Sequence, residues 1–397
     1  MKEYGMNILF CYWNSICEPG LTHAFTQLGH QVIPFQHPIS NKDLDKQYLA
    51  ALAAFLKQHP EVNCVFSINF IPIIAKVCTI YRIPYISYTV DSPSLTLSSK
   101  SLGSPYCHAF LFDRTLYQQY AALFPDNVYY LPLGADTLLY DTILSSEEDH
   151  ANYDCEVSFI GSFHTENCIY DKVAPRLPEQ MRGYIDGLIQ AQLQVYGCDL
   201  IKNAFSDQWA EEFKRYAGWS VLPDYNEDIR AIIADQYIGF KCTQTDRIQT
   251  LQAISREFPI DLYTTEDTSM LPTIHNRGIA KSFTMMPKIF QCSKINLNMT
   301  ARTIKSGIPQ RIFDIMAAGG FVLSNYQSEI PEYFIPGKDL ILYESIPDLI
   351  EKIRYFLAHE DERAQIAQNG YQKVKSCHTL VQRAQEILRI ILCSQSF

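Results

Sequence analysis

The chain has 397 residues, of which 47% are hydrophobic and 19% are charged, and its formal net charge is −10. These values predict a globular protein of two domains and exclude both a disordered chain and a broadly basic nucleic-acid-binding surface. A single basic pocket for a diphosphate remains compatible with the charge. No apolar run reaches the roughly 18 residues of a membrane span, and the first residues lack the apolar run of a signal peptide.

The 12 cysteines are scattered along the chain and form no CxxC pair. This distribution predicts reduced thiols rather than a disulfide framework or a zinc site. We therefore expect a cytoplasmic protein.

The first part of the chain alternates apolar strand patterns with amphipathic helix patterns. Helices are predicted at 21–28, 44–58 and 71–80, and strands at 7–12, 31–35, 64–68, 85–90, 108–112 and 128–131. Strands separated by helices indicate a parallel sheet with right-handed crossovers. Residues 1–150 are therefore predicted to form a Rossmann-like domain.

A second series of strands and helices follows a polar, acidic stretch at 145–153, which we interpret as a linker. A strand at 156–160 is followed by a turn at Gly161 and Ser162. The backbone N–H groups of this turn could face a phosphate, or the turn could simply connect the strand to the next helix. A helix-rich insertion is predicted at about 170–235, and a strand at 260–263. Amphipathic helices are predicted at 348–358, 362–373 and 379–393.

The segment 294–323 is the most informative part of the chain. It is predicted to form a strand at 295–299, a polar loop, a helix that begins near Ser306 with Pro309 in its first turn, a glycine pair and a further strand. Serine is a good helix N-cap residue, and a proline costs little in the first turn.

The chemistry of this helix suits a sugar nucleotide. Gly307 would let a ligand approach the backbone, and a helix N-terminus attracts phosphate. Arg311 can clamp a diphosphate, and Asp314 can accept hydrogen bonds from a sugar diol. Arg302 and Lys305 add charge in the preceding loop. The same spacing also fits an ordinary strand–helix–strand packing unit with surface charges.

Several motifs occur in the order expected for one family. The C-terminal ones read MPKIFQCSKINLN, SGIPQRIFDIMAAGGFVLSNY, EIPEYFIPGKDLILYES and HEDERAQIAQNGYQKV, and weaker ones upstream read YTVDSP, FLFDR and VYYLPLGAD. On these motifs the chain resembles the CgeB-like, or spore-maturation-protein-like, family of GT-B glycosyltransferases, together with the N-terminal domain that accompanies it.

The resemblance implies an α/β fold of the GT-B type, with two Rossmann-like domains facing each other across a cleft and a helical insertion in the second. It implies a nucleotide-sugar-binding domain at 151–376 and a terminal helix at 377–397 that packs back on the N-terminal domain. The alternative is a helix that covers its own domain.

The resemblance also implies a reaction. It suggests transfer of a sugar, with GlcNAc favoured, from a UDP-sugar to a Ser/Thr hydroxyl of a protein such as flagellin. The donor would be held by Ser306, Gly307, Arg311 and Asp314, with Arg302 nearby. The only DxD motif lies at 43–45, in an expected helix start, so no metal or other cofactor is expected.

The chain departs from the pattern of many retaining enzymes, in which two glutamates stand eight residues apart. Ser306 and Asp314 occupy those positions here, which weakens the case for retention and favours inversion.

Inversion needs a base from the first domain. The candidates are Asp91, which follows a strand, then Asp113 and His23. Asn69 could orient the acceptor or the donor sugar. Each candidate base also has a structural reading: an Asx turn for Asp91, a pair with Arg114 for Asp113 and a place inside a helix for His23.

Two other functions fit the sequence. The first is a sugar-nucleotide-binding partner subunit without transfer activity, and the second is a sugar-nucleotide epimerase of the same fold. The oligomeric state stays open.

Overall fold

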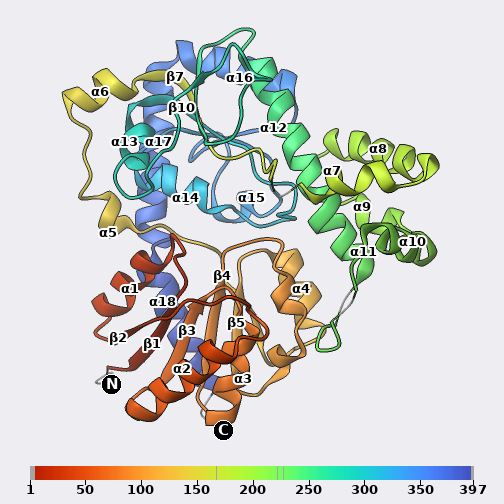
Figure 1. Cartoon of the computed structure of the whole chain (residues 1–397). Coiled ribbons are helices and arrows are strands. Elements are labelled where there is room, and N and C mark those ends of the chain that lie inside the picture. The colour runs from red at the N-terminus through yellow and green to blue at the C-terminus, as the bar shows by residue number, and fades with distance from the viewer. Residues whose placement is uncertain (1–4, 167, 221, 227, 395–397) are drawn as a thin grey trace. The chain divides into compact units, whose positions relative to one another are not determined.

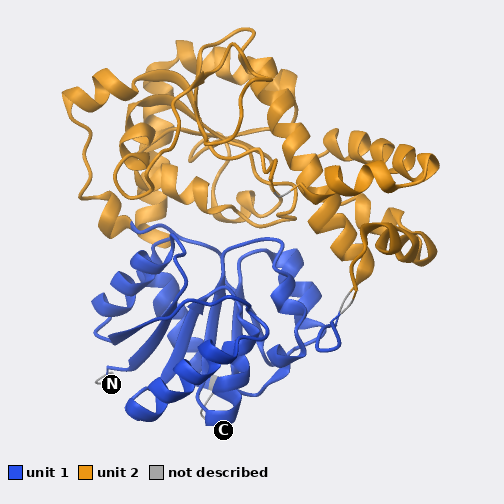
Figure 2. Cartoon of the chain, in the orientation of Figure 1, with its two compact units in different colours: residues 1–136, 221–227, 378–397 blue, residues 137–220, 228–377 orange. Residues whose placement is uncertain are grey.

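The computed structural model describes residues 5–166, 168–220, 222–226 and 228–394 (Figure 1). The chain divides into two compact units (Figure 2). Unit 1 contains residues 1–136, 221–227 and 378–397, and unit 2 contains residues 137–220 and 228–377. Unit 1 is therefore assembled from three separate pieces of chain, and the first passage between units lies at 136–137 rather than at 150.

Unit 1 is built on a parallel six-stranded sheet of order β2-β1-β3-β4-β5-β6. Its strands are β1 (Asn7–Tyr12), β2 (Gln31–Gln36), β3 (Cys64–Ile68), β4 (Tyr85–Thr89), β5 (Cys107–Leu111) and β6 (Val128–Tyr130). Its helices are α1 (Glu18–Gln27), α2 (Lys46–Gln58), α3 (Pro72–Tyr81), η1 (Leu95–Ser98), η2 (Lys100–Gly103), α4 (Arg114–Ala121) and α18 (Leu380–Ser394).

The central strands of this sheet are mainly apolar, and their polar residues Ser67, Ser87, Thr89 and His108 are buried with the rest. Every residue of β3, β4 and β5 is buried, as expected for parallel strands that are covered on both faces. The terminal helix α18 packs against α1 and buries Ala384, Ile387 and Ile391 completely.

Unit 2 contains the second parallel six-stranded sheet, of order β12-β11-β10-β7-β8-β9. Its strands are β7 (Cys155–Ile160), β8 (Ile260–Tyr263), β9 (His275–Asn276), β10 (Ser293–Asn298), β11 (Val322–Asn325) and β12 (Ile341–Tyr343). The helices outside the insertion are α5 (Thr137–Tyr140), α6 (Glu147–Tyr153), α12 (Phe240–Ile254), α13 (Met286–Cys292), α14 (Gln310–Ala317), α15 (Ile330–Tyr333), α16 (Ile346–Ala358) and α17 (Glu360–Cys377).

The helical insertion of unit 2 has a core of its own, which includes Ile185, Phe213 and Ile233. Its helices are α7 (Ile169–Val173), η3 (Ala174–Arg176), α8 (Glu179–Leu193), α9 (Ile201–Ala204), α10 (Asp207–Ala217), α11 (Ile229–Ile232) and the π-helical η4 (Ile233–Gly239). Between α10 and α11 the chain contributes a short piece to unit 1. There Tyr225 forms an antiparallel bridge with Ser99, and the Lys100 N–H donates to the Asp224 carbonyl at 2.8 Å.

Two sequence-based assignments are wrong. The stretch expected to be a linker contains helix α6, which begins with a capping box between Ser146 and Asp149. Helix α14 begins at Gln310 instead of near Ser306, with Pro309 as its N-cap. The physical reason is that a residue before proline is disfavoured in the helical region, so Ile308 cannot continue a helix from Ser306.

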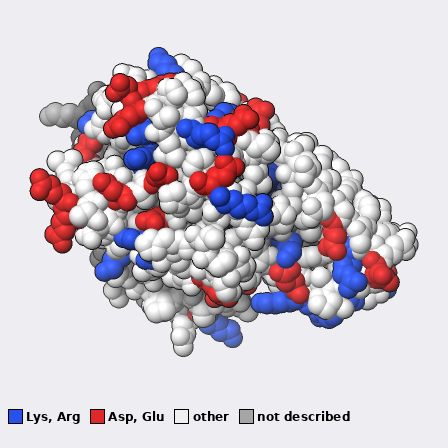
Figure 3. Space-filling model, turned by 90° about the horizontal axis from the view of Figure 1, so that it is seen from above, with Lys and Arg blue, Asp and Glu red and all other residues white. Residues whose placement is uncertain are grey.

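The surface charges are mixed in sign. Figure 3 shows basic and acidic side chains intermingled on the face it presents, without a broad field of one sign. Within the described residues, no helix combines the length and the apolar character needed to cross a bilayer.

The packing of α18 against the rest of unit 1 yields a stability prediction. Leu388 is 4% exposed, whereas Leu392 on the same helix is 49% exposed. Leu388→Ala should destabilise the protein by about 2–5 kcal/mol, because it leaves a cavity among buried side chains. Leu392→Ala, the matched control, should change the free energy of unfolding by less than about 1 kcal/mol. Chemical denaturation measures both, and equal losses would contradict the packing of α18.

Candidate active site

The loop that follows β7 is held by one carboxylate. Glu266 accepts hydrogen bonds from the N–H groups of Phe163 (2.8 Å) and His164 (3.1 Å) and from the hydroxyl of Thr165 (3.1 Å). The Gly161 N–H donates to the Tyr263 carbonyl at 3.2 Å. These N–H groups therefore bond within the protein, and a phosphate could use them only by displacing their partners.

His164 stands in this loop with a backbone φ of +61°, a conformation uncommon for residues other than glycine. Burial, with a contribution from the charge of Arg247, lowers the pKa of its imidazole to about 4, so the side chain is neutral at pH 7. Within the described residues, its buried Nδ1 has no hydrogen-bond partner. Strained backbone and unsatisfied polar atoms of this kind gather at functional sites.

Arg247 joins the loop after β7 to the loop after β10. Its guanidinium donates to the carbonyl oxygens of Ser162 (2.5 Å) and Met299 (2.6 Å). Burial lowers its pKa to about 10, which still leaves the group charged at pH 7. A single buried cation thus fixes the ends of two neighbouring central strands.

Arg302 belongs to a buried ion pair. Its guanidinium donates to both carboxylate oxygens of Asp246 (3.0 and 3.1 Å) and to the Val195 carbonyl (2.6 Å), and it lies over the Tyr196 ring at 3.8 Å. Burial opposes its charge, but Asp246 outweighs burial and raises the pKa of Arg302. A contact with a donor diphosphate would require these bonds to break, so we do not include Arg302 in the donor site.

Lys305 is likewise engaged inside unit 2. Its ammonium lies 2.8 Å from carboxylate oxygens of both Asp199 and Asp235, and these two carboxylates outweigh burial and raise its pKa. Burial raises the pKa of Asp235, whereas Lys305 holds that of Asp199 low against the effect of burial. The loop after β10 is thereby fastened to the insertion.

A small pocket lies where this loop meets the insertion, lined by residues that include Gln192, Asn325 and Gln327. The side-chain amides of these three residues all bond to backbone groups. Arg302 and Lys305 line the pocket, whereas Arg311 and Asp314 do not, so it overlaps the donor site expected from the sequence only in part.

Helix α14 carries Arg311 and Asp314 on adjacent turns. Arg311 Nη1 lies 3.9 Å from the Asp314 carboxylate, and its guanidinium stands 5.5 Å from the centre of the Phe290 ring. The Asp314 carboxylate also accepts a hydrogen bond from Gln310 at 2.8 Å. An ion pair at 3.9 Å is weak, so the guanidinium can turn to another anion at small cost.

Ser306 and Gly307 are buried in the loop before α14 instead of forming its first turn. The Ser306 carbonyl accepts from the Glu329 N–H at 3.3 Å, and Gln327 donates to the carbonyl of Gly307 at 3.5 Å. These two residues shape the loop, and their expected position at the helix N-terminus is wrong.

Asn69 and Asp91 meet at the carboxyl ends of β3 and β4 in unit 1. Asn69 has φ of +59°, and its amide donates to the Asp91 carboxylate at 2.6 Å. The Asn69 side-chain oxygen accepts from the Val90 N–H at 2.9 Å. Asp91 itself is exposed, so the structure presents a fixed and accessible carboxylate at the sheet edge where ligands of parallel folds bind.

The other two expected bases differ in exposure. Asp113 is fully buried and caps α4 by accepting from the Leu116 N–H at 3.1 Å, which leaves it out of reach of an acceptor. His23 lies on α1 with its side chain 58% exposed, and its Nδ1 is 3.8 Å from the Asp136 carboxylate. His23 is thus accessible, but 3.8 Å is too long for a hydrogen bond with Asp136.

Arg247, Glu266 and Asp246 were missed by reasoning from the sequence. Arg247 and Asp246 lie in TQTDRIQT, a polar stretch of α12 that the structure buries. These residues could have been recognised as polar side chains in a helix that packs against a sheet. The spacing of apolar residues alone does not reveal them.

Comparison with known proteins supports the fold and the enzyme class. Residues 247–389, which include α14, match a family model described as glycosyl transferase-like. A comparison with curated protein sequences finds no match. The CgeB-like assignment is finer than these findings and stays a prediction.

Solved structures share the fold over nearly the whole chain. A glycosyltransferase from Rickettsia africae is 11% identical, with a TM-score of 0.58 and coverage of 99% of each chain. HepE from Anabaena, solved with UDP and glucose, is 14% identical, with a TM-score of 0.55 and coverage of 98% of this chain and 100% of HepE. A sucrose-phosphate synthase from Thermosynechococcus elongatus is 9% identical, with a TM-score of 0.58 and the same coverage.

The prediction of a GT-B α/β fold is confirmed by these structures, whose low identity supports the fold alone. The family model and the fold agree on one enzyme class, glycosyltransferase.

The low pKa of His164 yields a prediction on acid stability. The folded state holds the imidazole neutral down to about pH 4, whereas the unfolded chain takes up a proton near pH 6.5. Stability should therefore fall as the pH drops from 6.5 to 4. His164→Asn, which tolerates the left-handed backbone, should remove up to about 1.4 kcal/mol per pH unit from this slope.

Urea denaturation across this pH range measures the slope. His275→Asn, at a histidine whose side chain is 63% exposed, serves as the control. An unchanged slope in His164→Asn would show that the imidazole is protonated in the folded protein.

Proposed function

We propose that the protein transfers a sugar from a UDP-sugar to an acceptor hydroxyl. The observation that carries the proposal is the match of residues 247–389 to a glycosyl transferase-like model within a chain of GT-B fold. UDP is proposed because HepE, a structural neighbour, was solved with UDP and glucose.

In this proposal α14 binds the donor. Arg311 turns from its 3.9 Å contact with Asp314 to the diphosphate, and Asp314 accepts hydrogen bonds from the ribose hydroxyls. The charge that develops on the leaving diphosphate is then met by a guanidinium, so no metal ion is required for the chemical step. The buried Arg247 supports the site by fixing the two loops beside it.

Asp91 is the proposed base. It takes the proton of the acceptor hydroxyl as the oxygen attacks the anomeric carbon in line with the departing UDP, which inverts the configuration at that carbon. Two observations support Asp91 over Asp113: it is exposed, and Asn69 fixes its carboxylate at 2.6 Å. His23, whose exposed imidazole lies 3.8 Å from Asp136, is the second candidate.

The sugar and the acceptor rest on the family resemblance alone. GlcNAc is the favoured sugar, and a Ser/Thr hydroxyl of a protein such as flagellin is the favoured acceptor. A screen of UDP-sugars against flagellin is therefore the first acceptor assay.

The donor site is tested by nucleotide binding. UDP in the presence of EDTA should raise the midpoint of thermal unfolding, and GDP, ADP, dTDP and CMP should not. Arg311→Ala and Asp314→Ala should each weaken UDP binding about tenfold or more, because each removes a charged hydrogen-bonding group, worth roughly 1.5–3 kcal/mol. Calorimetry measures the affinities, and Arg215→Ala, at an exposed arginine on α10, is the matched control.

Wild-type UDP affinity in both α14 variants would refute the assignment of Arg311 and Asp314. A failure of every nucleotide to stabilise the protein would refute the proposed donor altogether.

The base is tested by separating binding from turnover. Asp91→Asn should lower kcat by about 100-fold or more while leaving UDP affinity unchanged, since an amide cannot take the proton yet still accepts the hydrogen bond from Asn69. His23→Ala should retain most activity. Loss of turnover in His23→Ala, with turnover retained in Asp91→Asn, would assign the base to His23. Conversion of the donor to an isomer without release of UDP would identify an epimerase.

A further inference from the structure

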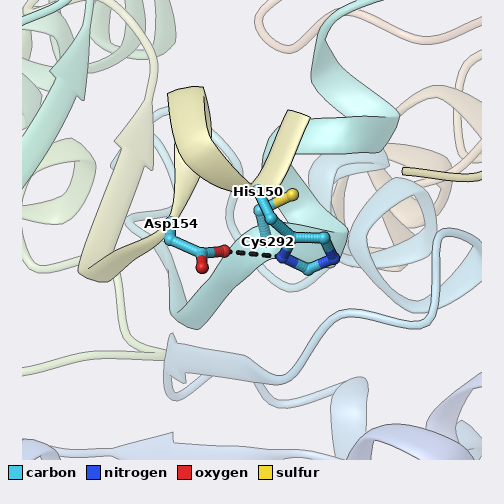
Figure 4. A group of neighbouring side chains, drawn as sticks. All are labelled: His150, Asp154 and Cys292. Atoms are coloured by element: carbon cyan, nitrogen blue, oxygen red, sulfur yellow. Dashed lines mark hydrogen bonds and ion pairs between the residues drawn. The ribbon is translucent and has the colours of Figure 1, made fainter. Parts of the chain in front are cut away.

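A cluster of metal-ligating side chains lies in unit 2, at the contact between α6 and α13 (Figure 4). It consists of His150 in α6, Asp154 at the C-cap of that helix and Cys292 at the end of α13. One ligand atom from each side chain lies within 4.8 Å of the other two. Among the residues that the structure describes, this is the one group of three such side chains found so close together.

His150 and Asp154 form the first half of the cluster. They stand four residues apart, so they project from the same side of one helical turn, and His150 Nδ1 lies 2.7 Å from the Asp154 carboxylate. Pairs of ligands with this spacing commonly chelate a metal from a single helix. Both side chains are about half exposed, which leaves them free to rotate around an incoming ion.

Cys292 completes the cluster from the facing helix. Its thiol is buried, with 6% of the residue exposed, so it offers a fixed ligand beneath two adjustable ones. Nitrogen, oxygen and sulfur ligands together suit Zn²⁺, whereas Mg²⁺ and Ca²⁺ take oxygen ligands.

The two helices are held together independently of any ion. Lys288 of α13 lies 2.9–3.0 Å from the Asp149 carboxylate of α6. Gln291 accepts from the Ser145 N–H and donates to the Ile143 carbonyl, both at 2.7 Å. The ligand positions are thus organised before a metal arrives, which lowers the entropic cost of binding.

The surroundings of the imidazole favour Nδ1 as the ligand atom. Ser145 Oγ lies 3.2 Å from His150 Nε2 and can accept a hydrogen bond from an N–H there, as the outer partners of metal-bound histidines do. The nearby charge of Lys288 is countered by Asp149, which reduces its repulsion of a cation.

We propose that His150, Asp154 and Cys292 bind one divalent ion of the zinc class, with water as the fourth ligand. Metal–ligand bonds of about 2.0–2.3 Å require the ligand atoms to approach one another by rotation of the two exposed side chains. On binding, Nδ1 gives up the proton that it donates to Asp154, the neutral imidazole takes a proton at Nε2 instead and donates it in a hydrogen bond to Ser145 Oγ, and the thiol proton leaves to solvent.

The ion would tie α6 to α13 and thereby stabilise unit 2. The proposal assigns it no part in sugar transfer and does not rest on the proposed function. It departs from the expectation that the chain holds no metal, which came from the lack of a CxxC pair and from the position of the only DxD motif in an expected helix start.

Cobalt titration tests the site directly. The full chain, freed of metal with a chelator, is titrated with Co²⁺, whose bond to a thiolate gives a charge-transfer absorption. We expect saturation at one equivalent and displacement by Zn²⁺. Cys292→Ser should abolish the band and His150→Ala should weaken binding at least tenfold, whereas Cys198→Ser, at an exposed cysteine, should match the wild type.

Thermal unfolding provides a second readout and a control for folding. Without metal, Cys292→Ser should unfold near the wild-type midpoint, and Zn²⁺ should raise the midpoint of the wild type and Cys198→Ser only. A cobalt–thiolate band that persists in Cys292→Ser, the lack of any band at one equivalent, or a Zn²⁺ shift shared by Cys292→Ser would overturn the proposal.

Discussion

The organisation of the candidate donor side depends on the buried guanidinium of Arg247. It donates to the carbonyls of Ser162 and Met299, which follow the neighbouring central strands β7 and β10. A charge at this depth is costly without hydrogen bonds, so both loops are constrained to positions in which their carbonyls accept from Nη1 and Nη2. Glu266 adds the opposite charge nearby and holds the N–H groups of the first loop. The edge of the sheet is therefore preorganised by internal ions before any ligand binds.

The cost of leaving a buried charge unpaired also decides which cations can bind a ligand. Arg302 and Lys305 look like phosphate-binding residues in the sequence, but each is committed to buried carboxylates that connect the loop to the insertion. Removing a charge from such a pair to bind a diphosphate would strand a buried carboxylate, at a cost of about 3–5 kcal/mol. Arg311 is held by weaker contacts, namely the 3.9 Å ion pair with Asp314, Met286 Sδ at 3.5 Å and the Phe290 ring at 5.5 Å, so its reorientation costs less. This difference in cost is the reason for proposing Arg311 as the donor cation.

The sheets could be predicted from the sequence because parallel strands covered on both faces must be apolar runs, and β3 and β8 have the predicted bounds. The start of α14 was predicted from a favourable serine, while the conformational restriction that Pro309 places on Ile308 decided the outcome. The buried ions could not be predicted in this way. Arg302 and Asp246 are 56 residues apart, and only the folded chain shows that they meet.

Helix α13 contacts both Arg311 of the proposed donor site and helix α6, which lie far apart in the sequence. Met286 and Phe290 contact the guanidinium of Arg311, through Met286 Sδ at 3.5 Å and the face of the ring at 5.5 Å. Lys288, Gln291 and Cys292 of the same helix contact or lie beside α6. Met286 and Phe290 stand one turn apart on this helix, which also carries the residues that face α6, so the packing of α13 against α6 also places the surface on which Arg311 rests. The orientation of the proposed donor cation is thus set by packing between α6 and α13 as well as by α14 itself.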